Sequence, residues 1–160
     1  MTKKTLKQGQ VFIAEPFMAD PHFKKAVVAL CDYSREEGAV GFILNRPTNL
    51  KMEEVMSDFP EFDSFINYGG PVANDTIHYM HRVGDLVEGS KEIVKGLYWG
   101  GDFKKLKFLI ANEVIKPIDI KFFIGYSGWT PGQLEEEAEI NSWVIDDMDI
   151  NYPFLNNAVD

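Results

Sequence analysis

The sequence has one cysteine, Cys31, and no long apolar run. A single cysteine excludes an intramolecular disulfide framework and fits a reducing, cytoplasmic setting. The longest apolar run, Ala26–Cys31, is far shorter than the roughly 20 residues that a membrane-spanning helix needs. Glu15 and Pro16 break the first apolar run before it reaches the length of a signal peptide. We therefore expect a soluble cytoplasmic protein that does not associate with membranes.

Basic residues are missing from the C-terminal part of the chain. Residues 131–160 contain eight Asp or Glu and no Lys or Arg, and they account for most of the net charge of −9. Proteins that bind nucleic acids usually carry a concentrated basic footprint. The densest basic group, Lys104, Lys105 and Lys107, is typical of a solvent-facing helix surface. Direct nucleic-acid binding is therefore not expected.

The composition is that of a globular protein with a core. Hydrophobic residues make up 45% of the 160 residues and aromatic residues 13%. A chain of this length buries roughly two thirds of its unfolded surface in one domain. No repeat, low-complexity stretch or flexible linker divides it. We therefore expect a single domain over residues 1–160.

Hydrophobic periodicity predicts a mixture of strands and helices. Ile118, Ile120 and Phe122 alternate with Asp119 and Lys121, which indicates a strand with one polar face. Because the strands come as hairpins and singles without strict βα alternation, the order favours an α+β fold with a mainly antiparallel sheet. The expected strands are Val11–Ala14, Ala26–Cys31, Ala39–Leu44, Ile66–Tyr68, Thr76–Val83, Ile93–Trp99 and Ile118–Tyr126, and the expected helices are Met52–Phe59, Phe103–Ile110 and one that Thr130 caps and Pro131 opens.

Neither the histidines nor the acidic residues predict a metal site. His78 and His81 are separated by an odd number of positions on one expected strand, so they point to opposite faces and cannot share an ion. His22 follows the turn at Asp20 and Pro21. The acidic run at residues 146–149 lacks the glycine and the closing Glu of a calcium loop, so we expect a solvated tail there. No metal and no cofactor are expected.

The segment Gly125–Gly128 combines a serine with glycines before an expected helix. It resembles a nucleophile elbow, but its second glycine comes one residue too early, so Ser127 is either a nucleophile or a turn hydroxyl. The free N–H groups at the helix start could instead bind an anion or a small polar ligand. The third interpretation is a structural turn packed by Trp129.

Glu137 is expected beside the apolar stripe of that helix, on the same face as Leu134. A half-buried carboxylate needs a partner, and Arg46 is the first candidate because arginine can pair with it in a bidentate geometry. The pair would be a structural link between helix and sheet. The alternative is a catalytic carboxylate.

Three ordered motifs resemble the YqgE/AlgH family of small bacterial proteins. The match covers most of the chain, from about Gly9 to Trp143. The motifs are Ile13–Pro16 with Met18–Phe23, then Gly38–Gly41 with Leu44–Pro47 and Tyr68–Val72, and finally Gly125–Trp129 with Gly132–Glu135 and Glu137. The chain departs from the family pattern at Ala26, where serine is usual, and at Asp32-Tyr33, where an acidic residue and a histidine are usual.

The resemblance implies one α+β domain whose bifurcated sheet curls toward a pseudo-barrel with about three helices around it. It implies no assigned activity, although one branch is named for regulation of alginate production. We therefore expect a binding or regulatory module with an indirect role in transcription, acting on an unknown protein or a small polar or anionic ligand. The alternative is a small hydrolase that uses Ser127 or Glu137. The candidate binding residues are Asn45, Arg46, Gly69, Gly70, Ser127, Gly128, Trp129, Gln133 and Glu137.

Overall fold

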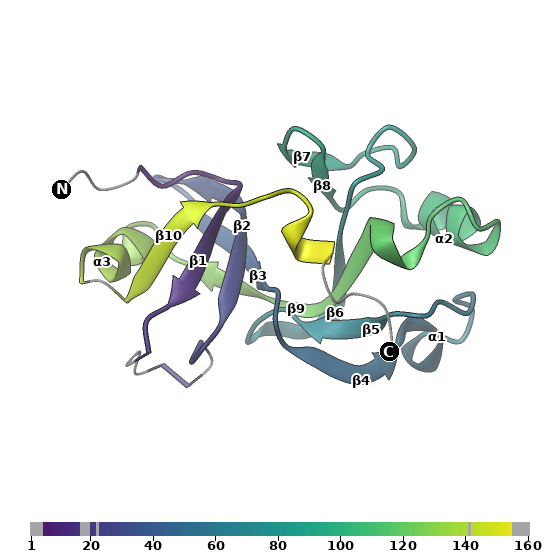
Figure 1. Cartoon of the computed structure of the whole chain (residues 1–160), viewed down its shortest axis with the longest axis horizontal. Helices are drawn as coiled ribbons and strands as arrows, with labels where there is room; N and C mark the ends of the chain where they lie inside the picture. Colours follow the sequence, from purple (N-terminus) through teal and green to yellow (C-terminus); the bar gives the residue numbers. More distant parts are fainter. Residues whose placement is uncertain (1–4, 17–19, 22, 141, 155–160) are drawn as a thin grey trace.

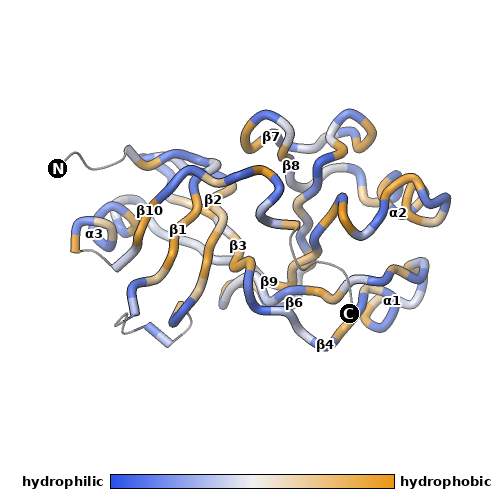
Figure 2. The backbone as a smooth tube through the Cα atoms, viewed as in Figure 1, coloured by the Kyte–Doolittle hydropathy of each residue, from blue (hydrophilic) through white to orange (hydrophobic). Residues whose placement is uncertain are grey.

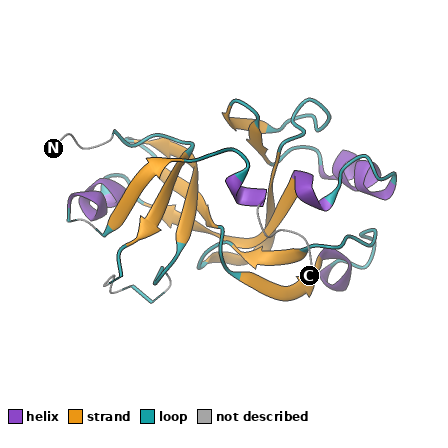
Figure 3. Cartoon of the chain, viewed as in Figure 1, coloured by secondary structure: helices purple, strands orange, loops and turns teal. Residues whose placement is uncertain are grey.

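The computed structural model describes residues 5–16, 20–21, 23–140 and 142–154, so His22 and part of the Met18–Phe23 motif lie outside the described residues. In this part of the chain, ten strands form one open, mainly antiparallel sheet, and three α-helices lie beside it. Figure 3 shows the strands in the middle of the molecule and α-helices at its two ends. The expected single α+β domain is confirmed.

The sheet consists of two groups of strands joined by one long strand. The strand order is β10-β1-β2-β3-β9-β6-β8-β7, and β5 pairs with β9 in parallel while β4 pairs with β5. We call β10, β1, β2 and β3 the first wing and β4 to β8 the second wing; β9 belongs to both (Figure 1). The strands are β1 (Gln10–Ala14), β2 (Val27–Ser34), β3 (Gly38–Ile43), β4 (Pro47–Lys51), β5 (Phe65–Tyr68), β6 (Val72–His81), β7 (Lys91–Val94), β8 (Leu97–Trp99), β9 (Ile120–Trp129) and β10 (Trp143–Asp147).

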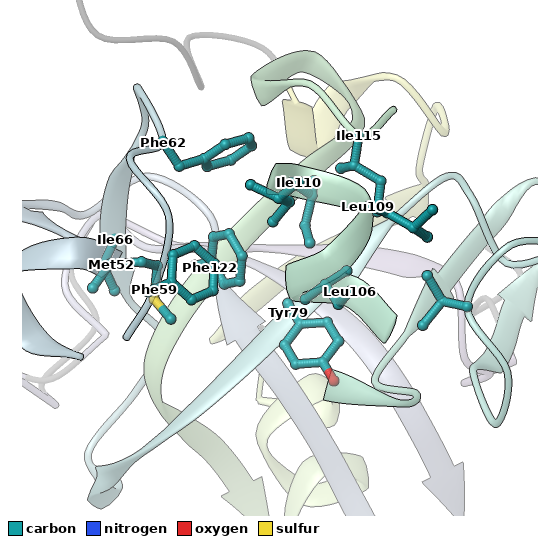
Figure 4. Close-up of a cluster of buried hydrophobic side chains, with 12 residues drawn as sticks. Met52, Phe59, Phe62, Ile66, Tyr79, Leu106, Leu109, Ile110, Ile115 and Phe122 are labelled. Carbon is teal, nitrogen blue, oxygen red and sulfur yellow. The ribbon is translucent and has the colours of Figure 1, made fainter. Parts of the chain in front are cut away.

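Hydrophobic side chains gather in three clusters, two on the outer faces of the wings and one between the wings. Helix α3 (Gln133–Glu139) contributes Leu134 to the cluster of the first wing. Helices α1 (Met52–Val55) and α2 (Phe103–Ala111) cover the second wing, where Figure 4 shows Leu106 and Ile110 of α2 close to Phe122. The inter-wing core comprises Val11, Ala29, Cys31, Phe42, Leu44, Met80, Ile93, Leu97, Phe123, Met148 and Phe154.

The hydropathy of the chain follows this arrangement. Figure 2 shows strongly hydrophobic stretches along β1 and β2, and alternating hydrophobic and hydrophilic turns along α2. Helix α2 begins as expected at Asp102, whose side chain accepts the N–H groups of Lys104 and Lys105. This N-cap satisfies two of the free N–H groups at the helix start.

Several expected elements differ in extent. The run Ile93–Trp99 is a tight hairpin, β7 and β8, because Gly96 adopts a left-handed conformation with φ +89° and reverses the chain. The helix expected over Met52–Phe59 ends at Val55. Strands β4 and β10 were not expected. β10 overlaps the predicted solvated acidic tail: Asp146 and Asp147 are exposed as expected, but they lie in a strand, Trp143–Asp147, that pairs with β1.

The largest difference concerns the segment Gly125–Gly128, which was expected to form a turn at the end of the strand Ile118–Tyr126. It lies inside β9, which continues to Trp129 and pairs Ser127 with Gly41 of β3. Gly125 has φ +71°, and this left-handed residue lets β9 change partners from the second wing to the first. Helix α3 therefore starts later than expected, and Gly132 takes the N-cap position that was predicted for Thr130.

A short 3-10 helix, η2 (Tyr152–Phe154), lies between the two wings in Figure 1. The Arg82 guanidinium holds it, because its Nη1 donates to Asn151 Oδ1 at 2.9 Å and its carbon lies 4.3 Å from the centre of the Phe154 ring. A second tie joins the wings directly: Lys91 Nζ lies 2.8 Å from Asp32 Oδ1. Helix η2 and the pair of Lys91 with Asp32 therefore cover part of the face between the wings. The candidate site includes residues on this face.

Candidate functional site

The predicted residues Asn45 and Arg46 brace the loop that precedes β2. Asn45 Oδ1 accepts the N–H of Val27 at 2.9 Å, and its Nδ2 donates to the carbonyl of Lys25 at 2.9 Å. Arg46 Nη2 donates to the carbonyl of Lys24 at 2.6 Å. The expected pair of Arg46 with Glu137 does not form.

The glycine pair Gly69-Gly70 and Ser127, all predicted binding residues, contact one another. Gly69 donates its N–H to Ile124 O at 2.9 Å, and its carbonyl accepts the Ser127 hydroxyl at 3.0 Å. A Cβ on Gly70 would overlap the backbone of Tyr126, so only glycine lets this turn lie directly on β9. Ser127 is 0% exposed. These groups therefore bond to one another and leave no hydroxyl open to a ligand.

Trp129, Gln133 and Glu137 form a separate group near α3, and Gly128 lies before them in β9 opposite Val40. Glu137 Oε1 accepts the indole N–H of Trp129 at 3.1 Å and of Trp143 at 3.0 Å, while its Oε2 accepts Gln133 Nε2 at 3.1 Å. The carboxylate thus ties α3 to β9 and β10. The predicted site residues fall into three groups, and their polar atoms are largely satisfied within the protein.

Another set of side chains meets on the face between the wings. We call His78, Tyr126, Trp99 and Phe42 the aromatic patch; they come from β6, β9, β8 and β3. The Phe42 ring centre lies 5.4 Å from that of His78 and 5.9 Å from that of Trp99, and His78 lies 5.6 Å from Tyr126. Phe42 is buried, whereas the other three are half-buried. The patch therefore presents ring surface to solvent above the inter-wing core.

Of the two described histidines, His78 is half-buried and His81 is fully buried. Burial lowers the pKa of His78, and its Nε2 lies 2.9 Å from the Thr76 hydroxyl. Burial lowers the pKa of His81, whose Nδ1 accepts the N–H of Val83 at 3.3 Å while its Nε2 lies 2.9 Å from Gly100 O. These bonds assign His81 the neutral tautomer with the proton on Nε2. His78 contacts the aromatic patch and His81 stacks on Tyr98, so they lie on opposite faces of β6, as their spacing predicted.

Lys121 is the residue that sequence reasoning missed. Alternation along Ile118–Phe122 placed it on a polar face, yet it is only 4% exposed. Its cross-strand partner Met80 belongs to the inter-wing core, so Lys121 lies on the inter-wing face of β9. Burial lowers its pKa to about 8. The sequence contained one signal of this burial, a single lysine directly before the apolar run Phe122–Ile124. A strand that is covered on both faces reads as a continuous apolar run, so alternation no longer shows which residues are exposed.

These features define a class: an α+β module with an open two-winged sheet and a half-buried aromatic patch between its wings. The AlgH-like family model matches residues 11–159. The chain belongs to this family, and the resemblance predicted from its motifs is confirmed. No helix in the described part of the chain has the length and apolar character needed to cross a membrane.

Relatives share most of their length with this chain. The UPF0301 protein CT0663 of Chlorobaculum tepidum is 45% identical over 151 residues, which cover 94% of this chain and 80% of that protein. The UPF0301 protein of Cytophaga hutchinsonii is 39% identical over 153 residues, which cover 95% of this chain and 84% of that one.

Two solved structures share the fold. The solution structure of the AlgH protein from Pseudomonas aeruginosa superposes with a TM-score of 0.75 at 30% identity, and the match covers 97% of this chain and 85% of that one. The crystal structure of protein DIP2367 from Corynebacterium diphtheriae gives a TM-score of 0.74 at 21% identity and covers 93% of this chain and 80% of that one. At that identity the second match supports the fold alone.

Proposed function

We propose that this protein is a ligand-binding module without catalytic chemistry of its own, and that its ligand lies on the aromatic patch. The observation that carries the proposal is that His78, Tyr126 and Trp99 remain half-exposed around Phe42 where the two wings meet. Aromatic rings supply contact area together with a polar tip, and small-molecule sites are lined mainly by such side chains. Such sites occur preferentially where structural units meet, as at the interfaces between domains.

The contacts of the two candidate catalytic residues favour binding over hydrolysis. A serine nucleophile must reach its substrate and must contact a base. Ser127 is 0% exposed, and its hydroxyl donates to Gly69 O. Glu137 is occupied by two indoles and the Gln133 amide. Neither side chain has the free polar atom that the hydrolase alternative requires.

We place this module in the cytoplasm and assign any effect on transcription to an indirect route through a protein partner. The fully buried thiol of Cys31, whose pKa burial raises, is compatible with a reducing compartment. The net charge of −9 opposes association with phosphate backbones. Fluorescence anisotropy with duplex DNA at low salt should therefore give a flat curve, and salt-sensitive binding would contradict the indirect route.

The binding proposal is tested with a library of neutral aromatic fragments and ¹H–¹⁵N spectra of the folded chain. We expect the shifted amides to gather around His78 and Tyr126. Tyr126→Ala should abolish these shifts, whereas Phe108→Ala should not, because Phe108 is an exposed ring on α2 outside the patch. Fragments that collect on another surface, or that bind the Tyr126 variant equally well, would refute the proposal.

A further inference from the structure

Lys121 carries a positive charge that the fold leaves without a counterion. Its side chain is 4% exposed, and no hydrogen bond or ion pair with it is found among the described residues. Desolvation is the cause of its lowered pKa of about 8, with no charged neighbour contributing. A buried ammonium without a partner is costly, so such groups are usually paired or replaced by apolar residues. At neutral pH the group is still mainly protonated, which means that the free protein carries this cost.

Two further donors on the same face also lack an acceptor. Among the described residues, Arg82 Nε and Trp99 Nε1 are the buried side-chain polar atoms without any hydrogen-bond partner. Buried donors are nearly always satisfied in folded proteins, and each exception calls for an explanation. Lys121 itself keeps a small exposed fraction of 4%.

The strand register places these three donors on one face of the three neighbouring strands β8, β6 and β9. Met80 of β6 pairs with Trp99 of β8 on one side and with Lys121 of β9 on the other. Directly paired residues in an antiparallel sheet project from the same face. Arg82 follows Met80 by two positions and extends to Phe154 of the inter-wing core, so it lies on that face too. We call Trp99, Lys121 and Arg82 the donor row.

We propose that the donor row is an anion site, which binds the carboxylate or phosphate group of the ligand whose ring lies on the aromatic patch. Trp99 belongs to both sets, so one small molecule can contact them together. An ammonium and a guanidinium N–H are the donors that form charge-assisted hydrogen bonds with such oxygens. This inference rests on the proposed function, from which it takes the position of the ligand, and it adds the chemical class of that ligand.

Two other charged side chains near the donor row, Lys91 and Asp32, are already paired with each other. Lys91 pairs with Trp99 across β7 and β8, but its Nζ contacts Asp32 Oδ1 at 2.8 Å. The Nη atoms of Arg82 donate to Asn151 Oδ1 and Ile118 O. Among the described residues on this face, the three donors of the row therefore remain for an incoming anion, and we expect them to bind one carboxylate or phosphate group.

The test compares benzoate, phenyl phosphate and benzamide in titrations followed by ¹H–¹⁵N spectra and calorimetry. Benzamide has the shape of benzoate without its charge, and the two anions distinguish a carboxylate ligand from a phosphate ligand. We expect at least one anion to shift the amides of Met80, Trp99 and Lys121, and benzamide to bind at least about tenfold more weakly. Lys121→Met should remove that difference between charged and neutral probes.

The matched control is Lys104→Met, which removes an exposed lysine from α2 and should leave both affinities unchanged. Lys121→Arg retains the charge and should recover part of the preference for the anion. An affinity for benzamide equal to that for both anions, anion binding that survives Lys121→Met, or binding mapped to α2 would each overturn the anion site. If neutral fragments still gather on the aromatic patch in those cases, the proposed binding function stands without it.

Discussion

The buried charge of Lys121 should reduce the stability of the free protein. Its folded pKa of about 8 lies below the ordinary value of 10.5, so the folded state binds this proton less tightly than the unfolded state does. By linkage, stability increases as the pH rises from about 8 towards 10.5, and the full destabilisation is present below pH 8. A shift of this size corresponds to roughly 3 kcal/mol.

We therefore expect Lys121→Met to be more stable than the parent by about 1–3 kcal/mol at pH 7, because the methionine fills the same space without a charge. This advantage should shrink towards pH 10. Urea denaturation at the two pH values measures both effects, with Lys104→Met as the neutral surface control. A destabilised Lys121 variant would show that the ammonium has a structural partner.

His81 should make the fold sensitive to mild acid. Its pKa is lowered by burial, so below pH 6.5 the unfolded chain takes up the proton before the folded chain does. The free energy of unfolding should fall as the pH drops from 7.5 to 5.5, by at most about 1.4 kcal/mol per pH unit for this one proton. His81→Gln retains an N–H for Gly100 and should flatten the slope in urea titrations. An unchanged slope would mean that other titrating groups cause the pH dependence, and His78 would be the first of them to test.

At the scale of elements, Glu137 fixes the position of α3. Its Oε1 accepts two indole N–H groups, so Glu137→Ala leaves both donors without a partner and should lower the free energy of unfolding by about 2 kcal/mol or more. Glu136→Ala removes an exposed carboxylate from the same helix and should change it by less than about 0.5 kcal/mol. Urea denaturation with near-UV circular dichroism of the tryptophans measures both. Equal effects of Glu137→Ala and Glu136→Ala would contradict the role of Glu137 in fixing the position of α3.

The elements of this fold were predictable where local sequence decides them. The Asp102 cap and the β-branched runs of β2 and β3 required no knowledge of the tertiary fold. β10 was not predictable, because its acidic residues Asp146 and Asp147 indicate solvent and the strand forms only against β1. The extension of β9 through Ser127 depends on the bend at Gly125 and on pairing with β3, and neither signal is local.

The candidate site was predictable only in part for the same reason. Gly69, Gly70 and Ser127 do meet, but the sequence could not show that their polar groups satisfy one another. The aromatic patch draws on four strands, and its members are ordinary core residues in the sequence. Lys121 was misplaced because period-two alternation assigns faces without showing whether a second layer covers them.

At the scale of the whole molecule, the wings should unfold together. β9 pairs with β3 in the first wing and with β5 and β6 in the second, so this one strand joins the two wings and also joins the two parts of the second wing. We expect one transition in urea, because proteins of this size with a shared sheet are usually cooperative. Trp129 and Trp143 report the first wing, and Trp99 of β8 reports the junction at which the second wing contacts Phe42 of the first.

The experiment compares two variants. In Trp99→Phe, the remaining fluorescence comes from Trp129 and Trp143 of the first wing. In Trp143→Phe, Trp99 contributes a larger share of the fluorescence. Each variant is also followed by far-UV circular dichroism. Coincident midpoints for the two probes within each variant are the expected result. Separate midpoints would mean that the wings are independent folding units despite the common strand.

The pairing of β1 with β10 joins residues that lie 137 positions apart, from Gln10 to Asp147. During translation, β1 can therefore pair with β2 early. Its other edge stays unpaired until almost all the remaining chain has left the ribosome. Such non-local pairing slows folding and leaves an edge exposed to other chains in the meantime. The nascent protein should accordingly depend on chaperones most just before β10 emerges.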